Sequence, residues 1–433
     1  MKRRDYYLYT DLNKKEYFTL PEQWDPLYFL ETASEETHTS IMEMTIEALN
    51  NLRGIPPFKQ LFSEAKSISI IIDDATRPTP TREILKILLP YLKDHGFYSE
   101  KISIIVALGT HEHMSRQSLE AKLGSDVLSA YRIIQHNAWD KDLIPIEISK
   151  KRKIVRINQF VAKADLRIGI SSVLPHPMAG YGGGPKIIMP GVCDFEYIRD
   201  HHMENVKHPK SIAGTIKGNP FHEGILEVAK AVGLDLSINC VYNQKGEVIK
   251  IIAGNLETAF EEAVDLCFEK LGYRFEEKVD ITITSTYPHT HGHQIFKGLH
   301  TPDIITKESG AILLIAPIVS PIPTDFLNSI NTIKEKSNQN PVQYVKDALS
   351  KGIPILPDKP MDFNMAMSTM FLRPKIRTIL VSKNSSKEVA DKLGFEYATS
   401  IEDGLRLLKR EFPKARVAVF PTGGLIVPIT SRS

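Results

Sequence analysis

The sequence predicts an α/β protein with two domains: an N-terminal domain with a largely parallel, Rossmann-like sheet and a smaller α/β C-terminal domain. Two observations carry this prediction. Short β-branched runs alternate with amphipathic helical patterns along the chain. The chain has 433 residues, 42% of them hydrophobic and 24% charged, and is therefore long enough for two globular domains.

The predicted elements of the first domain follow in chain order. SISIII is a short β-branched run and predicts a strand over 67–72, and TREILKILLPYLKDHG predicts a helix over 81–96 that stops at Gly96. KISIIVALG predicts the next strand over 101–109, and SRQSLEAKLG predicts a helix over 115–124. Further along, the same patterns predict a strand over 164–174 and helices over 222–233 and 256–272.

A domain boundary is predicted after Gly272, where a charged stretch precedes a new apolar run. The first domain then covers 1–272 and the second covers 278–407, and the tail 408–433 is a candidate to return to the first domain. The polar segment 321–345, which contains several prolines, predicts a loop or irregular insert. Strands are predicted in this half of the chain at 279–288, 311–317, 377–383 and 415–429.

Composition and charge exclude several classes of protein. The formal net charge of +2 gives no electrostatic footprint for nucleic acid. The start MKRRDYYLYT lacks the apolar stretch of a signal peptide, and the longest apolar run, 311–320, is shorter than the roughly 20 residues that span a bilayer. Three widely spaced cysteines indicate neither a disulfide framework nor a Cys-rich zinc site. We therefore predict a cytoplasmic protein with no nucleic-acid or membrane partner.

Three motifs follow predicted strands of the first domain. DDATRPTP comes after 67–72, GTHEH after 101–109, and PHPMAGYGGGPK after 164–174. Ligand sites of parallel α/β sheets collect at the carboxyl ends of the strands, so we expect these motifs to form one site.

The glycine stretch of the third motif resembles an anion cradle. Gly180, Gly182, Gly183 and Gly184 let the backbone approach a ligand closely, and Lys186 follows them. The stretch is not a Walker A loop, in which a glycine precedes the lysine and Ser or Thr follows it, because Pro185 and Ile187 flank Lys186 here. It is not a GxGxxG fingerprint either, because Pro185 stands at the third glycine position. The alternative is a tight structural turn.

The other two motifs offer charged and titratable side chains. Arg77 of DDATRPTP could form paired hydrogen bonds with a carboxylate or phosphate, although an acidic strand end also serves as a helix cap. Imidazole titrates near neutral pH and binds nickel, zinc and copper, which makes the strand-end histidines candidates for acid–base or metal chemistry. Each one alone could be an ordinary surface or core residue. The candidates are His111, His113, His176, His201 and His202.

A fourth motif, HTHGHQIFK, lies in the predicted second domain. His289, His291 and His293 alternate and could form a zinc site, but a solvated loop is the favoured interpretation. Gln294 and Lys297 are three residues apart and share a face of a helix that begins near His293. An amide and an ammonium on one face suit a substrate that carries a carboxylate.

With these four motifs in this order, the sequence resembles the nickel-dependent lactate racemase family. The resemblance covers residues 67–300 and, more loosely, the rest. It implies an active site in the cleft between the domains and a nickel-pincer nucleotide, the nickel complex of pyridinium-3-thioamide-5-thiocarboxylic acid mononucleotide. It further implies that Lys186 tethers this cofactor and that His202 ligates the nickel, with His201 as the competing ligand.

The resemblance also implies roles for the remaining motif residues. The backbone of 73–77 and the glycine turn would hold the nucleotide, with contributions from Asp73, Asp74, Ala75, Thr76, Arg77, Gly183 and Gly184. His111 and His176 would be the two acid–base groups while the C2 hydrogen of a 2-hydroxy acid moves as hydride. Arg77, Gln294 and Lys297 would bind the substrate. Cofactor-synthesis and maturation proteins are the implied partners; the oligomeric state is left open.

The sequence departs from the family pattern on the substrate side. Thr290 stands where an aspartate is common, Pro317, Ile318 and Pro321 replace an acidic segment, and Gly182 replaces a common serine. These departures favour a racemase or epimerase of another 2-hydroxy acid, such as a larger or sugar acid. Two other classes remain as alternatives: a nucleotide-dependent oxidoreductase, and a non-catalytic protein that binds nickel through its alternating histidines.

Overall fold

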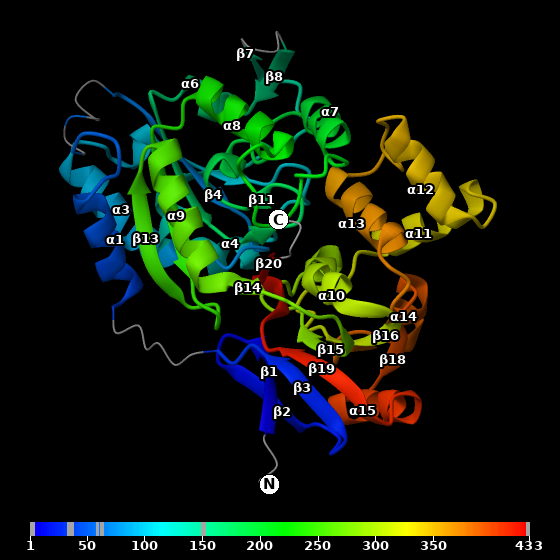
Figure 1. The fold of residues 1–433 in the computed structure, drawn as a ribbon. Coiled ribbons are helices and arrows are strands. Elements are labelled where there is room, and N and C mark those ends of the chain that lie inside the picture. Colours follow the sequence, from blue (N-terminus) through cyan, green and yellow to red (C-terminus); the bar gives the residue numbers. More distant parts are fainter. Residues whose placement is uncertain (1–4, 33–38, 58–59, 61–64, 149–152, 430–433) are drawn as a thin grey trace. The chain divides into compact units, whose positions relative to one another are not determined.

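The computed structural model describes residues 5–32, 39–57, 60, 65–148 and 153–429 (Figure 1). The chain divides into two compact units, each of which is treated by itself below. Unit 1 contains residues 1–34, 244–247 and 271–433, and unit 2 contains residues 35–243 and 248–270. The chain is an α/β protein, as predicted.

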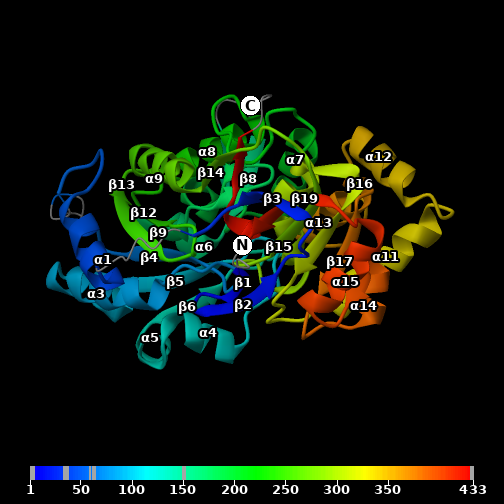
Figure 2. The same ribbon diagram turned by 60° about the horizontal axis from the view of Figure 1, so that its bottom comes forward.

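A six-stranded sheet forms the centre of unit 2, in the order β13-β12-β9-β4-β5-β6 (Figures 1 and 2). The five strands from β12 to β6 run parallel, and β13 pairs with β12 in the antiparallel sense. The sheet is therefore largely parallel, as predicted. Its strands are β4 (Ile68–Asp73), β5 (Ile102–Ala107), β6 (Arg132–Gln135), β9 (Leu166–Ser172), β12 (Leu236–Tyr242) and β13 (Val248–Gly254).

β4 occupies the position that locates the site. All six of its residues are buried, as its β-branched sequence predicts for a central parallel strand. Ile70 pairs with Ile104 of β5 on one side and with Ile168 of β9 on the other. The chain therefore winds in one direction from β4 to β5 and in the opposite direction from β9 onward. Ligands of such sheets bind at the carboxyl ends of the strands beside this reversal.

The helices of unit 2 begin and end close to the predicted residues. Ser115 caps α4 by accepting a hydrogen bond from the Ser118 amide, and α8 starts before residue 222 because Asn219 caps it. Pro90 lies inside α3 without ending it. The helices are α1 (Ile41–Asn50), α3 (Thr81–Asp94), α4 (Arg116–Leu123), α5 (Ser125–Ala130), α6 (Gln159–Lys163), α7 (Phe195–Asn205), α8 (Pro220–Val232) and α9 (Leu256–Leu271), with 3₁₀ turns η1 (Ser99–Lys101) and η2 (Gly184–Ile187).

Two short hairpins complete the strands of unit 2. β7 (Ile144–Ile148) pairs with β8 (Lys153–Ile157), and β10 (Pro175–His176) pairs with β11 (Gly180–Tyr181). The second hairpin connects the carboxyl end of β9 to the glycine stretch.

Unit 1 contains a second six-stranded sheet, in the order β18-β17-β16-β15-β19-β3, and all of its strands are parallel. A hairpin of β1 (Asp5–Asp11) and β2 (Lys14–Thr19) and a parallel pair of β14 (Gly272–Arg274) and β20 (Val427–Ile429) lie outside this sheet. The sheet strands are β3 (Trp24–Phe29), β15 (Val279–Ser285), β16 (Thr306–Ile315), β17 (Arg377–Val381), β18 (Glu396–Ala398) and β19 (Ala415–Phe420).

The structure groups the two ends of the chain differently from the predicted boundaries. β19, in the tail, pairs with β15 and with β3, so both termini contribute strands to the sheet of unit 1. The tail therefore does not return to the sheet of unit 2. The apolar residues of β3 and β19, including Trp24 and Val419, belong to the same buried core as β15.

The segment 321–345 is helical, so its prediction as a loop or irregular insert was wrong. Pro323 and Pro341 stand at helix starts, where a missing backbone N–H costs nothing, and the apolar residues after Pro323 recur at helical spacing. No helix of the described residues is long and apolar enough to cross a membrane. The helical segments of unit 1 are η3 (Gly292–Leu299), α10 (His300–Ile305), α11 (Thr324–Lys336), α12 (Pro341–Ser350), α13 (Met361–Leu372), α14 (Lys387–Leu393), α15 (Ile401–Glu411) and η4 (Gly423–Leu425).

Candidate functional site

The loops after β4, β5 and β9 carry most of the predicted site residues, and all three belong to unit 2. His201 and His202 lie on α7 of the same unit. Gln294 and Lys297 lie on η3 of unit 1. His113 is exposed, unlike the other histidines predicted at this site.

The loops after β4 and β5 are joined by a histidine–carboxylate pair. His111 Nδ1 lies 2.5 Å from Asp74 Oδ2, and the Asp74 side chain is only 6% exposed. Because the carboxylate accepts the Nδ1 hydrogen, the neutral imidazole carries its lone pair on Nε2. Asp74 thereby fixes the tautomer of His111 that can act as a base at Nε2.

Asp74 also organises the turn that follows it. Its Oδ1 accepts hydrogen bonds from the backbone N–H and the hydroxyl of Thr76, and the Arg77 guanidinium donates to that hydroxyl at 2.6 Å. Burial, the largest single effect, would raise the pKa of Asp74, and the charge and hydrogen bond of His111 act against it. With a smaller contribution from Arg77, they hold the pKa of Asp74 well below its ordinary value. Asp74 is therefore an anion at any physiological pH.

His176 has the opposite arrangement of its ring nitrogens. Its Nδ1 accepts hydrogen bonds from the backbone N–H groups of Met178 and Ala179, at 3.3 and 3.1 Å. The neutral ring consequently carries its hydrogen on Nε2. His111 thus presents a lone pair at Nε2, whereas His176 presents an N–H there.

Asp73, the last residue of β4, has a structural role. Its carboxylate accepts hydrogen bonds from Lys122 at 2.8 Å, from Thr79 and from the Ser172 backbone N–H. The Lys122 ammonium also donates to the carbonyl oxygens of Arg77 and Thr79. Lys122 of α4 therefore holds both ends of the 73–79 loop, and the sequence analysis missed it because 49 residues separate it from Asp73.

The glycine stretch needs its glycines for two reasons. Gly183 and Gly184 have φ angles of 75° and 50°, which favour glycine. A Cβ atom on Gly184 would come within 2.2 Å of the Phe260 ring, and one on Gly183 within 2.6 Å of the Ser172 carbonyl oxygen. The backbone here passes directly over the carboxyl end of β9. The glycines therefore serve both a tight turn and a close approach of the backbone to neighbouring groups of the protein.

Phe221, at the start of α8, brings the lysine and the two adjacent histidines together. The Lys186 Nζ lies 5.9 Å from the centre of its ring. His201 and His202 both pack edge-on against the same ring, with centroids 4.7 and 4.8 Å away. Sequence analysis missed Phe221 because an apolar residue at a helix start carries no chemical signal of its own.

Hydrogen bonds distinguish the two adjacent histidines. His202 Nδ1 donates to the Ile198 carbonyl oxygen at 2.7 Å, which places the lone pair of the neutral ring on Nε2. His201 instead uses Nε2 to donate to the Phe221 carbonyl oxygen at 3.0 Å. A metal-binding imidazole usually donates its other ring N–H to a carbonyl or carboxylate. In His202 the donating nitrogen is Nδ1, which leaves the outer nitrogen, Nε2, to bind a metal. In His201 the donating nitrogen is Nε2, so a metal would have to bind Nδ1, next to the residue's own backbone.

The ammonium of Lys186 is destabilised in this environment. Burial, and to a lesser degree the positive charge of Arg77, lower the pKa of Lys186 to about 7. Burial and the charge of Lys186 in turn lower the pKa of His222 to about 4. A large fraction of Lys186 is therefore an uncharged amine near neutral pH, which is the nucleophilic form.

The alternating histidines of unit 1 form neither a solvated loop nor a zinc site. His289 and His293 are buried, which contradicts the loop prediction. Among the described residues, no group of three or more His, Cys, Asp or Glu side chains is placed to hold a metal. His293 forms an ion pair with Asp362 instead, with Nε2 2.8 Å from the carboxylate. Storage of nickel by these histidines is thus unsupported.

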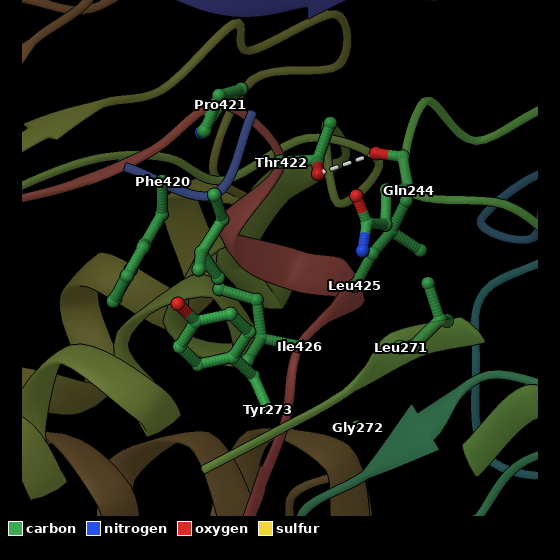
Figure 3. A pocket seen from close by; sticks show the side chains of 10 residues that line it. Gln244, Leu271, Gly272, Tyr273, Phe420, Pro421, Thr422, Leu425 and Ile426 are labelled. Carbon is green, nitrogen blue, oxygen red and sulfur yellow. Dashed lines mark hydrogen bonds between the residues drawn. The ribbon is translucent and has the colours of Figure 1, made fainter. Parts of the chain in front are cut away.

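Unit 1 also has a small pocket that contains none of the predicted site residues (Figure 3). Phe420, Leu425 and Ile426 give it an apolar wall, and the Thr422 hydroxyl donates to the Gln244 carbonyl oxygen at 2.7 Å. Its lining offers no charged group, so we do not assign it to the chemistry of the site.

Comparison with known proteins gives a consistent result. Residues 13–214 match the family described as the lactate racemase N-terminal domain. The lactate racemase of Thermoanaerobacterium thermosaccharolyticum is 28% identical over 307 residues, which cover 69% of this chain and 71% of the relative. The lactate racemase of Lactiplantibacillus plantarum is 25% identical over 407 residues, which cover 92% and 93% of the two chains.

Solved structures share the fold. The structure of the lactate racemase apoprotein from T. thermosaccharolyticum superposes with a TM-score of 0.81 at 23% identity, over 98% of this chain and all of the other. A Thermotoga maritima protein superposes with a TM-score of 0.67 at 16% identity, over 92% of this chain and all of the other.

The lowered pKa of Lys186 predicts selective reactivity toward an amine-acylating reagent. At pH 7 about one in three thousand ordinary lysine side chains is unprotonated, against roughly half for a pKa near 7. Trace labelling of the cofactor-free chain, followed by peptide mass analysis, should show Lys186 modified well before the exposed lysines. Its labelling should rise with pH and level off above about pH 8. The Arg77→Gln variant should shift this rise to higher pH, and an unchanged profile would contradict the contribution assigned to the Arg77 charge.

Proposed function

Because residues 13–214 match the lactate racemase N-terminal domain and two lactate racemases are 28% and 25% identical to the chain, we propose that it is a member of this family, a racemase or epimerase that inverts C2 of a 2-hydroxy acid. The observation that carries this proposal is the His111–Asp74 pair at the carboxyl end of the sheet, beside a turn that holds Arg77. The pair supplies a base, and the guanidinium supplies a partner for a carboxylate.

The chemistry explains why a base acting on the hydroxyl group is needed. The C2 hydrogen of a 2-hydroxy acid is a poor acid, because a carbanion beside an ionised carboxylate is strongly disfavoured. Removal of this hydrogen with its electron pair avoids the carbanion, provided that a base takes the hydroxyl proton at the same time. His111 would take that proton at Nε2, and the Asp74 carboxylate would stabilise the imidazolium that results.

His176 would act on the same oxygen of the other enantiomer. In the described ring orientation it offers Nε2–H, a hydrogen-bond donor to a hydroxyl or carbonyl oxygen. To accept a proton at Nε2 the ring must carry its other hydrogen on Nδ1, where the N–H groups of Met178 and Ala179 now point. Exchange of roles between the two histidines therefore involves opening of the 176–179 turn.

The residues present fit the proposed nickel-pincer nucleotide. Lys186 is a nucleophilic amine beside a glycine backbone whose close packing tolerates no Cβ at Gly184. His202 has the hydrogen-bonded Nδ1 that a metal-binding imidazole needs, and Phe221 brings both side chains together. When bound, the cofactor would supply acceptance and return of hydride at C2. Lys186 would hold it covalently and His202 would ligate its nickel, with imidazole and sulfur as ligands that suit nickel.

The nucleotide would be held by the loop after β4. Thr76 offers its hydroxyl, and Arg77 offers a guanidinium. In the described state the backbone N–H groups of Thr76 and Arg77 are engaged by Asp74, so a phosphate at these groups would require the turn to rearrange. Ala75, Gly183 and Gly184 complete the proposed cradle. Substrate binding is assigned to Arg77, Gln294 and Lys297.

The ligand assignment predicts different metal contents for two neighbouring variants. After maturation with the cofactor-synthesis proteins, His202→Ala should retain at most about a tenth of the nickel of the parent chain, because an imidazole ligand is lost. His201→Ala should keep most of it, because it removes a hydrogen bond to a carbonyl oxygen and packing against Phe221 but not the proposed nickel ligand. Metal analysis by mass spectrometry measures both. Loss of nickel from His201→Ala alone would reverse the assignment.

Solvent exchange tests the proposed reaction. We expect that inversion of a 2-hydroxy acid in heavy water leaves the C2 position of both enantiomers nearly free of deuterium, because hydride does not exchange with solvent. A two-base enzyme that removes C2–H as a proton would introduce deuterium from the solvent. His111→Gln should lower turnover at least a hundredfold in both directions. Full deuterium incorporation at C2 would refute the hydride mechanism while leaving the fold assignment intact.

A further inference from the structure

Five buried side chains of unit 2 form one continuous network of hydrogen bonds at the carboxyl end of the sheet. The network runs from α4 through the last residues of β4 and β9 to the last residue of β12. The Lys122 side chain is only 7% exposed, and the other four residues are buried. Its members are Lys122, Asp73, Thr79, Ser172 and Tyr242.

The charged end of the network uses every hydrogen of the Lys122 ammonium. One goes to the Asp73 carboxylate at 2.8 Å, and the other two go to the carbonyl oxygens of Arg77 and Thr79 at 3.2 and 3.3 Å. The second oxygen of the carboxylate accepts from the Thr79 hydroxyl and from the Ser172 backbone N–H. The same charged pair therefore anchors both ends of the loop 73–79.

The hydroxyl hydrogens of the network have one consistent arrangement. A carboxylate can only accept, so the Thr79 hydroxyl donates to Asp73. The Ser172 hydroxyl, 2.5 Å from the Thr79 oxygen, must then donate to Thr79. The Tyr242 phenol, 2.6 Å from the Ser172 oxygen, must in turn donate to Ser172. Burial raises the pKa of Tyr242 well above its ordinary value, so the phenol keeps the hydrogen that this order requires.

Arg77 connects the network to the chemistry of the site. Lys122 holds the backbone carbonyl of Arg77, and the Arg77 guanidinium donates to the Thr76 hydroxyl. The positive charge of Arg77 also contributes to the lowered pKa of Lys186. Because the repulsion of two charges falls with their distance, this contribution depends on where the loop holds Arg77.

We propose that Thr79, Ser172 and Tyr242 are positioning residues, which together with the Lys122–Asp73 pair hold Arg77 within electrostatic reach of Lys186. The significance of this role rests on the proposed function, in which Lys186 is the tether of the cofactor. A network that only stabilised the fold would change the free energy of unfolding when broken. A positioning network also changes the reactivity of Lys186.

A neutral change within the network separates position from charge. Replacement of Lys122 or Asp73 would add or remove a charge near the site, and its effect on Lys186 could come from that charge alone. Thr79→Val keeps the shape of the side chain and the net charge of the chain. It removes only the hydroxyl that donates to Asp73 and accepts from Ser172.

Trace acylation of the full cofactor-free chain measures the pH at which labelling of Lys186 reaches half of its plateau. Thr79→Val should move this midpoint upward by roughly half a pH unit or more, because Arg77 is no longer held near the amine. Thr79→Ser, which retains the hydroxyl, should keep the midpoint of the parent chain. Thr45→Val is the matched control, since it removes a buried hydroxyl that donates to the Ile41 carbonyl oxygen within α1.

A double variant tests whether the effect passes through Arg77. Thr79→Val combined with Arg77→Gln should have the midpoint of Arg77→Gln alone, because displacement of an uncharged side chain changes no repulsion. If Thr79→Val does not fold, Tyr242→Phe serves in its place. It removes only the last donor of the network and should move the midpoint upward by a smaller amount.

Two results would overturn the positioning role: the parent midpoint in the folded network variant, or shifts that add in the double variant. A midpoint shift in Thr45→Val as large as that in Thr79→Val would do the same. Inversion of a 2-hydroxy acid by the matured parent chain is measured separately. Its absence would refute the proposed function and would leave the labelling result on the cofactor-free chain as it stands.

Discussion

The parallel pairing of β4 with β5 on one side and β9 on the other is the constraint on which the site depends. It places three loops at one edge of the sheet of unit 2, where the chain reverses its direction of winding. Asp74, the first residue after β4, reaches His111 in the loop after β5, and Gly183 packs on the end of β9. This strand pairing brings the charged and glycine-rich motifs, which are far apart in the sequence, to one edge of the sheet.

Electrostatics then distinguishes the groups within the site. Arg77 stabilises the anion of Asp74 and destabilises the cation of Lys186, so one guanidinium favours both a charged carboxylate and an uncharged amine. Buried Lys122 holds the ends of the loop that carries Arg77. The Asp74 partner of the proposed acid–base group and the proposed tether are thus both influenced by Arg77.

Much of the fold follows from the sequence, because β-branched runs such as SISIII and caps such as Ser115 are local signals. The motif residues of unit 2 were also recognisable, since their chemical types are unusual at strand ends. The grouping of β3 with β19 was not predictable, because it depends on pairing between opposite ends of the chain. The burial of His293 was missed for the same reason: Asp362 lies 69 residues away in the sequence.

The mass of the matured chain tests the central claim most directly. Intact-mass analysis and peptide mapping after co-expression with the cofactor-synthesis proteins should reveal a nucleotide-sized adduct on the peptide that contains Lys186. The adduct should be missing from Lys186→Ala, and the ability to invert a 2-hydroxy acid should be lost with it. An adduct on another lysine, or full activity of a chain without an adduct, would contradict the account.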